Sequence, residues 1–569
     1  MSAVAAAAAA LLVIAVACSP LPLGSGDSPA GQDSYRPQPA GQRGGTLLMS
    51  DFEYPHTLNP LTALTDLELR LGGLVFAPLW GFDNRLRPYP DLVREVPTTA
   101  NGEVKAARDG RSMTVDVRLA AGLRWSDGQP LTADDVLFTL AAIRDPATGA
   151  VAPGGLDRLQ GARRLSSTEL VLTFDGVYAP YLELGAGLFV MPAHRLATVP
   201  HSDWSQGSFF QRPDVGSGPF VVSEAATGDR LVFAANPEGG AGQQPVRHRA
   251  YLDQLTFKAQ SGRAALLGAL RGGTADLGFH LGPDDLPALT GIATSSPVSF
   301  TGLRDESLAP NHGDNSATGQ PPPWLNDRRV LDALDRAIDR SELVRQALAG
   351  SGAPVRGVFP RALSGFALGS RVPALRDLAG ARRLLDEAGW SQGGDGVRVK
   401  DGRRLQFGLM TVCGSVLDDR VLQLLQGQWQ ELGALAVTSC RPRDAFLGAT
   451  SSSAYDMTLF SNGWGPDPND WAGLVAEAPG QASDRCQDEP LGQAFESGAS
   501  TLDAARRRAI YTAAEKEWLV YHCTMPLFEV PQVTQVSTRL HNFAPSPGLG
   551  SETWNAADWW LSGAPGGGR

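Results

Sequence analysis

The chain has 569 residues, 43% of them apolar, which is enough for a large core and roughly two to four domains. Its net charge is −11 at pH 7. Because binding to nucleic-acid phosphates needs a basic face, we expect no nucleic-acid partner.

The chain begins with an apolar run, residues 3–17, that ends at Cys18. The run is too short for a membrane span, which takes about 20 residues, but it suits the apolar part of a signal peptide. Residues 15–18, Ala-Val-Ala-Cys, resemble a lipobox, in which the cysteine is lipidated. Ala15 stands where Leu is usual, and no Lys or Arg precedes the run. The alternative is a buried Ala-rich helix.

Residues 19–43 are rich in Pro, Gly, Ser and Gln, a composition that cannot supply a core. We therefore interpret residues 1–18 as a lipoprotein signal peptide and residues 19–43 as a flexible tether. Such a tether has a root-mean-square span of about 25–30 Å.

The body opens with a predicted strand, residues 45–51, and a turn-rich loop that contains Tyr54, His56 and Asn59. A helical pattern follows over residues 67–80 and ends at Ala77-Pro78.

Residues 122–146 give the clearest local signal. Trp125 to Gly128 form a predicted turn, since Asp127 can cap its own backbone and Gly128 takes a positive φ at little cost. Thr132 is the predicted N-cap of a helix with apolar residues at helical spacing, and Asp145-Pro146 ends that helix. Strands predicted at 111–119 and 170–174 flank it, so residues 77–200 form a predicted α+β unit.

The later elements follow in the same way. Residues 215–220 predict a tight turn into a strand rather than a phosphate loop, because Pro219 and a strand-like run follow. By composition, residues 304–323 are a predicted loop. The predicted helices are 263–270, 327–349, 375–390, 417–432 and 501–520, and later strands are predicted from 275, over 455–460 and over 525–530.

Four cysteines follow Cys18, namely Cys413, Cys440, Cys486 and Cys523. An even number outside the cytosol indicates two disulfides, for which three pairings exist. Cys413 and Cys440 each end an apolar strand-like run, with a helix between the runs, so the two strands should lie parallel and close. We therefore favour Cys413–Cys440, which leaves Cys486–Cys523. The competing metal site lacks a CxxC pair and a nearby His.

Several of these segments together resemble the peptide- and nickel-binding solute-binding proteins (family 5) that serve ABC importers. They are residues 122–146, Asn59-Pro60, the glycines of 216–220 and the helices from 327 and 375. The resemblance covers residues 44–545. The scarcity of lysine relative to arginine indicates a high-GC genome, such as that of an actinobacterium.

The resemblance implies an α/β, two-lobed periplasmic-binding-protein-like fold (type II, cluster C) with an extra small α+β domain. We expect lobe I to comprise residues 44–76, 201–297 and 525–569. The small domain takes residues 77–200, and lobe II takes residues 298–524.

The resemblance also indicates a ligand site. In peptide-binding members a Gly-Trp pair precedes, by two residues, an Asp that pairs with the ligand's α-ammonium; here Gly463-Trp464 gives that role to Asp467. Trp464 and Trp471 could line the cleft, and the loop with Tyr54, His56 and Asn59 borders it in relatives. The alternative is that Asp467 and Asp470 only cap a turn. For the ligand carboxylate the candidates are Arg356, Arg441 and Arg443.

The function implied is a lipid-anchored, extracytoplasmic binding protein that captures short peptides and delivers them to an ABC permease and ATPase. We expect a monomer that is not an enzyme and holds no cofactor or metal. The Gly389–Gly393 match to G-x-S-x-G follows a predicted helix instead of a strand, so a helix end is favoured over a nucleophile.

Two alternatives stay open. One is binding of nickel or another small solute, for which His56 is the candidate although the eight His residues show no ligand spacing. The other is a lipoprotein that regulates envelope synthesis without transport. The long polar stretch 304–323 and the presence of Leu331-Asp332, where the family usually has Arg and a small residue, favour that alternative.

Overall fold

The computed structural model describes residues 35–563, apart from residues 152, 240–248, 313–321, 356, 364, 367–374, 464, 476–485, 487–488 and 549–551. The described helices and strands all lie in one unit, residues 37–569. Cys18, and with it the predicted lipid anchor, lies outside the described residues.

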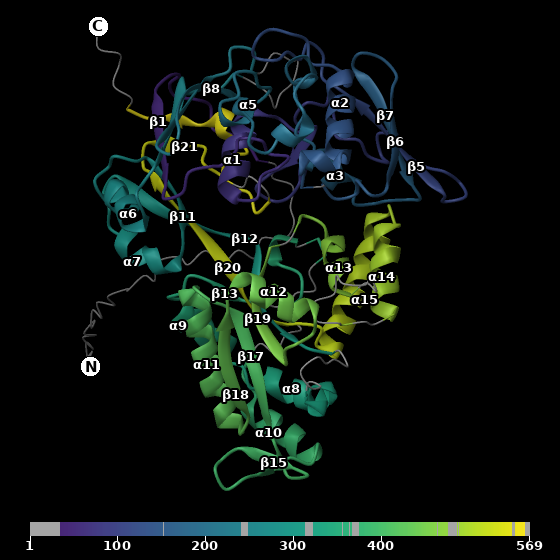
Figure 1. The fold of residues 1–569 in the computed structure, drawn as a ribbon, viewed down its shortest axis with the longest axis vertical. Helices are drawn as coiled ribbons and strands as arrows, with labels where there is room; N and C mark the ends of the chain where they lie inside the picture. The colour runs from purple at the N-terminus through teal and green to yellow at the C-terminus, as the bar shows by residue number, and fades with distance from the viewer. Residues whose placement is uncertain are drawn as a thin grey trace, which may run out of the picture. The chain divides into compact units, whose positions relative to one another are not determined.

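One large sheet runs through this unit in the order β18-β17-β19-β12-β20-β11-β1-β10-β9-β8, and β13 also pairs with β20. Its strands are β1 (Thr46–Asp51), β8 (Phe220–Ala226), β9 (Arg230–Ala235), β10 (Gln254–Ala259), β11 (Leu277–Leu281), β12 (Ser295–Pro310), β13 (Ala353–Pro354), β17 (Gln406–Val412), β18 (Leu435–Arg441), β19 (Met457–Gly463) and β20 (Met525–Ser537). We call the elements at the β8 end the first region and those at the β18 end the second region (Figure 1).

Two long strands, β12 and β20, connect the regions. They pair antiparallel from Ser295↔Ser537 to Leu308↔Met525, and β12 also pairs with β19. The prediction that residues 304–323 form a loop is therefore wrong for 304–310, which is strand. Asp305, Glu306 and Ser307 suggested a loop because they are polar, yet each is only 1% exposed between paired strands. The rest of that prediction, 313–321, lies outside the described residues.

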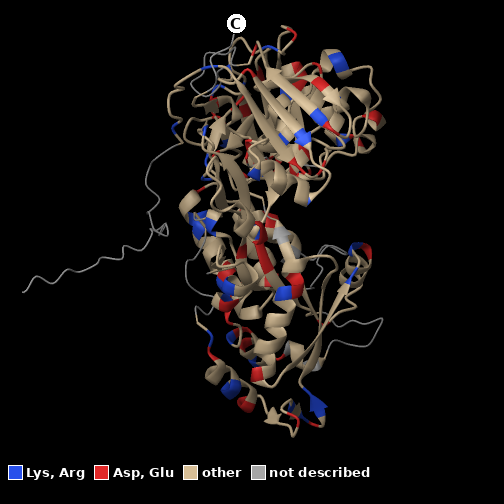
Figure 2. Cartoon of the chain, turned by 90° about the vertical axis from the view of Figure 1, so that its left-hand side faces the viewer, with Lys and Arg blue, Asp and Glu red and all other residues tan. Residues whose placement is uncertain are grey.

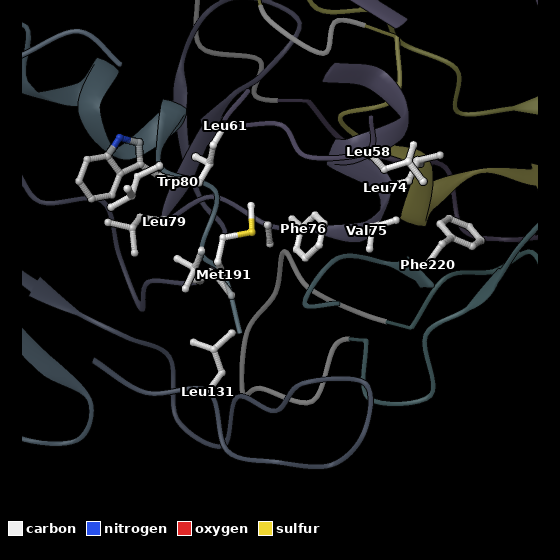
Figure 3. Packing of buried hydrophobic residues seen from close by; sticks show 14 of the residues in the cluster. Leu58, Leu61, Leu74, Val75, Phe76, Leu79, Trp80, Leu131, Met191 and Phe220 are labelled. Atoms are coloured by element: carbon white, nitrogen blue, oxygen red, sulfur yellow. The ribbon is translucent and has the colours of Figure 1, made fainter. Parts of the chain in front are cut away.

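The first region holds the largest hydrophobic core, part of which is shown in Figure 3, where Phe76, Trp80 and Met191 lie among aliphatic side chains. Helix α1 (Asp66–Val75) ends before the predicted Ala77, and its capping box joins Thr65 and Glu68. The chain then turns toward strand β2 (Trp80–Phe82), because Phe76 is already extended. The glycines of the 215–220 turn allow close packing on α1, since a Cβ at Gly216 would lie 2.4 Å from the Val75 carbonyl oxygen.

A second sheet of four strands lies within the stretch predicted as the α+β unit, in the order β4 (Val104–Ala106), β5 (Ser112–Arg118), β7 (Glu169–Asp175) and β6 (Leu159–Arg164). The predicted turn and cap of α2 (Ala133–Arg144) are confirmed: Asp127 accepts from the Gln129 N–H, and Thr132 and Asp135 form a capping box. The other elements of the first region are β3 (Pro88–Pro90), β21 (Leu540–His541), β22 (Trp560–Leu561), α3 (Tyr181–Gly187), α4 (Ala193–Leu196), α5 (Ser208–Gln211), α6 (Arg263–Arg271) and α7 (Leu286–Leu289).

The second region places helices against β17, β18 and β19. They are α8 (Arg328–Arg336), α9 (Arg340–Ala347), α10 (Leu378–Glu387), α11 (Val416–Leu432), α12 (Arg443–Ser451), α13 (Ala472–Val475), α14 (Glu489–Ala499) and α15 (Ala504–Tyr521), with short strands β14 (Ser391–Gln392), β15 (Arg398–Lys400) and β16 (Arg403–Arg404). The prediction of a single helix over 327–349 is wrong, because the first helix ends at Arg336. The Asp339 side chain accepts from the Glu342 N–H and begins a second helix there.

Both predicted disulfides, Cys413–Cys440 and Cys486–Cys523, are confirmed. The first joins the ends of β17 and β18, which are parallel neighbours, and β18 is the outermost strand of the sheet. Ser391 follows α10 after Gly389, whose φ of +87° ends the helix, so the G-x-S-x-G match is a helix end as predicted.

Among the described residues, no helix combines the length and apolar character that crossing a membrane requires. The division into lobes at residues 76, 200, 297 and 524 stays a prediction. Because β12 begins at Ser295 and β20 continues to Ser537, both crossing strands belong to the two regions jointly.

Candidate ligand-binding site

A cavity of about 1030 Å³, hereafter the large cavity, lies between the two regions beside the crossing strands. The first region contributes α1, the start of α6 and the segment after β11; the second contributes the segment after β17, α12 and β19. Its lining includes Asp66, Arg70, Arg263, His280, Asp284, Asp285, Arg304, Glu306, Thr411, Ser415, Asp418, Arg443, Phe446, Phe460, Gln532 and Glu552.

The position of the large cavity follows from the sheet. β11 and β17 both end at its wall, and the N-terminus of α11 begins there with Ser415 as its cap. Ligands in α/β proteins gather at the carboxyl ends of strands. The positive end of α11 is already matched by Asp418, which accepts from Thr411 Oγ1 at 2.9 Å.

The large cavity carries both signs of charge on its wall, and Figure 2 shows acidic and basic residues on the elements around the crossing strands. Arg70 is 3% exposed and its Nε donates to Glu552. Its Nη1 has no hydrogen-bond partner among the described residues. Arg70 thus presents a buried cation with a donor left over.

Glu306, on crossing strand β12, is the most deeply buried acid of the large cavity. It is 1% exposed, and its Oε1 has no hydrogen-bond partner within the described part of the chain. Burial raises the pKa of Glu306 well above its ordinary value, and the charge of Asp418 adds to the rise. Glu306 therefore keeps its proton to a higher pH than an exposed glutamate does.

An ion pair joins the two regions beside the large cavity. Arg420 Nη1 on α11 lies 2.9 Å from Asp284 Oδ1, which belongs to the segment after β11. Both side chains are substantially exposed, so the pair stands at the rim of the cavity.

A second space, the small cavity, has a volume of about 280 Å³. It lies between the first region and the loop after β19, which supplies Gly465, Pro466 and Asp470. Most of its lining is apolar, with Pro60, Leu69, Phe82, Tyr89, Phe189 and Trp554 among the residues. Its charged lining residues among those described are Asp91, Glu183 and Asp470, all acidic.

Asp467, the predicted partner of the ligand ammonium, is held by a residue that the sequence did not single out. Arg507 of α15 donates two hydrogen bonds to its carboxylate, at 2.8 and 2.6 Å, and the Asn469 N–H donates a third. The turn-capping alternative is thus present as well. The ligand role of Asp467 stays a prediction, in which an ammonium would share the carboxylate with Arg507.

Trp471 is the one described residue of the two tryptophans that were predicted to line the cleft. Trp471 is 1% exposed and packs against Phe359 and Trp518, inside a core of the second region. It lines neither cavity between the regions, since its ring fills that core. Trp464 lies outside the described residues.

The loop after β1 does not bring its predicted residues to the second region. Tyr54 and His56 line a separate cavity of about 210 Å³ whose walls all come from the first region. Asn59 is fully buried, where its Nδ2 donates to the Trp204 carbonyl and its Oδ1 accepts from the Leu61 N–H. The ligand roles of these three residues stay predictions.

Of the arginines considered for a ligand carboxylate, Arg443 lines the large cavity. Arg441 is exposed but does not line it, and Arg356 lies outside the described residues. Sequence reasoning missed Arg70, Glu183 and Glu306. An acid in a strand buried on both faces is a usable signal for Glu306, but the stretch was predicted as a loop.

The described residues contain no group of three or more His, Cys, Asp or Glu able to hold a metal ion by themselves. His280 lines the large cavity, where its Nδ1 lies 2.9 Å from Asp51 Oδ2. Burial alone would lower the pKa of His280, but the hydrogen bond and charge of Asp51 outweigh burial and raise it.

The amino-acid sequence is similar to those of several known proteins. Protein XP55 of Streptomyces lividans is 32% identical over 337 residues, which are 58% of this chain and 57% of XP55. The match thus spans little more than half of XP55. The oligopeptide-binding protein AppA of Bacillus subtilis is 24% identical over 452 residues, which are 77% of this chain and 76% of AppA.

Solved structures share the fold. AppA in complex with a nonapeptide aligns with a TM-score of 0.69 and 21% identity, over 93% of this chain and 100% of that chain. NikA of Brucella suis in complex with Fe(III)-EDTA aligns with a TM-score of 0.76 and 18% identity, over 91% of this chain and 100% of that chain. The expected two-lobed, periplasmic-binding-protein-like α/β fold is therefore confirmed.

A family model described as bacterial extracellular solute-binding proteins, family 5 Middle, matches residues 89–478. This match covers more than half of the chain. Together with the cavity between two regions joined by crossing strands, it identifies the chain as a member of the bacterial extracellular solute-binding proteins, family 5.

Proposed function

We propose that this chain is the substrate-binding lipoprotein of an ABC importer, which captures short peptides in the large cavity and delivers them to a membrane permease. The protein acts as a monomer outside the cytoplasm, tethered through a lipid on Cys18, and catalyses no reaction. The observation that carries the proposal is a cavity of about 1030 Å³ whose walls come from both regions and carry both signs of charge.

The size and chemistry of the large cavity support a peptide. Cavities of roughly 300–1,000 Å³ hold drug-sized ligands in proteins. A free peptide carries an ammonium and a carboxylate, so it needs acids and bases in one space, and the wall supplies Arg70 and Arg443 as well as Glu306.

The crossing strands suit closure over a ligand. β12 and β20 carry the chain between the regions as one paired ribbon, and the exposed ion pair of Arg420 with Asp284 adds a contact beside the large cavity. A peptide that touches both walls binds the closed state better than the open one, and that difference in affinity shifts the population toward closure.

Arg443 is the residue we assign to the peptide carboxylate. It is exposed and lines the large cavity, and no ion pair to it is formed within the described part of the chain. A charge-assisted hydrogen bond is worth about 1.5–3 kcal/mol, which corresponds to a tenfold or larger change in affinity.

The experiment joins native mass spectrometry with calorimetry. The mass of a ligand that purifies with the protein identifies the peptide length, and a peptide panel then gives affinities. Arg443→Gln should weaken binding of free-acid peptides by about tenfold or more and leave C-terminally amidated peptides unchanged. Arg441→Gln is the matched control, two residues away and outside the cavity lining. No peptide binding at all, or equal effects of the two variants, would count against the proposal.

A second candidate is a chelated metal, favoured by the position of His280 on the large cavity. The same mass spectra decide it, because a metal complex adds an isotope pattern that a peptide lacks. His280→Gln should then abolish the added mass, whereas His56→Gln, in the separate cavity of the first region, should not.

A further inference from the structure

The second-region wall of the large cavity has an apolar part beside its charged residues. A small hydrophobic cluster of its own lies between β17, β19 and α12, and its buried members include Met410 and Phe446. Val412 and Phe460 pack against this cluster at its border. Both of them line the large cavity together with Phe446, so one side of the cluster opens into the ligand space.

Leu447 extends this apolar surface into the large cavity. Its side chain is 51% exposed and belongs to the cavity lining, next to Phe446 in the chain. A single exposed leucine on an open surface needs no explanation. In a concave site, however, apolar side chains are the usual partners of a ligand's hydrocarbon. We call Val412, Phe446, Leu447 and Phe460 the apolar platform.

Arg443 and the apolar platform share one face of α12. Arg443, Phe446 and Leu447 all line the large cavity, and they stand at positions i, i+3 and i+4 of the helix. Side chains at these spacings are neighbours, with Cβ atoms about 5–6 Å apart. One turn of helix therefore presents a cation and an apolar surface side by side.

The C-terminal residue of a peptide carries the matching pair of groups. Its carboxylate and its side chain leave the same Cα atom, so the partner of the carboxylate also fixes where the side chain can lie. With the carboxylate on Arg443, that side chain is within reach of Phe446 and Leu447. An apolar side chain gains from burial there, whereas a polar one gives up hydrogen bonds to water and meets only hydrocarbon.

We propose that the apolar platform binds a large apolar side chain, such as that of Leu or Phe, at the C-terminal residue of the captured peptide. This inference rests on the proposed function and deepens it, because it assigns the class of peptide that the large cavity selects. Leu447 is the residue that determines this specificity, since it is the exposed member of the apolar platform on α12.

The first test compares two isomeric peptides, Ala-Ala-Leu and Leu-Ala-Ala, whose binding to the full chain is measured by calorimetry. The two peptides contain the same atoms and charges and differ in the position of the leucine side chain. Wild type should bind Ala-Ala-Leu at least tenfold more tightly, because burying a leucine side chain changes affinity by a factor of about ten or more. A preference below threefold overturns the proposal.

Variants of Leu447 then locate the preference. Leu447→Gln makes the side chain polar at similar size and should lower the preference at least threefold, whereas Leu447→Met should keep it. Leu165→Gln is the matched control, because Leu165 is 49% exposed and lines none of the three cavities. If Leu447→Gln weakens both isomers equally, Leu447 only contacts the first region on closure, and the assignment is wrong.

A second probe does not depend on peptide capture. N-acetyl-leucine and N-acetyl-asparagine each carry one carboxylate and have side chains of similar size, one apolar and one polar. Ligand-observed NMR should show a preference for N-acetyl-leucine that Leu447→Gln lowers. If both tripeptides bind equally well, the apolar platform is wrong while the transport function stands. If N-acetyl-leucine binds through Leu447 but no peptide binds, the transport function fails and the apolar site stands.

Discussion

The two cavities between the regions differ in the polarity and charge of their linings. The large cavity has acids and bases on one wall and carries part of its charge in internal pairs such as Arg70 with Glu552. The small cavity is mostly apolar and its charged lining, within the described residues, is only acidic. A space of mixed charge offers partners to many polar groups, whereas a mostly apolar space offers few. The comparison teaches that a mixed-charge lining and a mostly apolar lining are separated between two cavities here, and substitutions beside each cavity can test what each lining contributes.

The largest expected effect lies beside the small cavity, at Asp467. Asp467→Asn leaves Arg507 buried without a charged partner, and breaking a buried pair costs about 3–5 kcal/mol. We therefore expect the free energy of unfolding, measured by urea denaturation, to fall by about that amount. Asp157→Asn is the control, because the Asp157 side chain is 80% exposed.

The same variant decides the ligand role predicted for Asp467. Peptide affinity is measured at a temperature where the variant is folded. A loss of about a hundredfold supports direct pairing with the ligand ammonium. A loss of less than threefold assigns Asp467 to structure alone.

A smaller effect is expected in the large cavity, at Glu306. Its pKa is raised in the folded chain, so the folded state binds the proton more tightly than the unfolded state. Stability is therefore fully present below the unfolded pKa of about 4.3 and falls as the pH rises through the folded value. Glu306→Gln should remove this loss, gaining about 1.4 kcal/mol at alkaline pH per unit of the shift. Unfolding curves of wild type and Glu306→Gln at pH 4 and pH 8 check the prediction. A difference in the free energy of unfolding that is the same at both pH values would refute it.

The smallest effect is expected at the rim of the large cavity. Arg420 and Asp284 are 36% and 44% exposed, and such pairs contribute about 0.2–1 kcal/mol. Arg420→Gln should leave stability almost unchanged and speed ligand release slightly in low salt. Stopped-flow measurements at low and high ionic strength give the change in the rate of ligand release. A large effect that persists at high salt would mean that this pair, rather than the cavity wall, holds the regions together.

Local signals in the sequence were sufficient where neighbours in the chain decide the structure. The cap at Thr132 and the turn at Gly128 depend on residues close in sequence, and the first disulfide joins two strands that follow each other along the chain. The fold followed from the order of such segments and their family resemblance.

The site was harder to predict, because distant residues decide it. Asp467 has its partner on α15, and Glu183 meets the second region only in the folded chain. The polar residues 305–307 suggested a loop, since nothing local shows that strands cover them on both sides. The loop with Tyr54 and His56 lines a separate cavity of the first region, and no local sequence pattern indicates that placement.

The bond between Cys413 and Cys440 has a consequence for the outer border of the sheet. Among the described strands, β18 pairs with β17 alone, and an unpaired border invites extension by a strand of another molecule. The disulfide at the end of this border keeps β18 from separating from β17 and exposing it. In an oxidising compartment the disulfide stays formed, which disfavours strand-to-strand association at this border, and neither cysteine lines the large cavity.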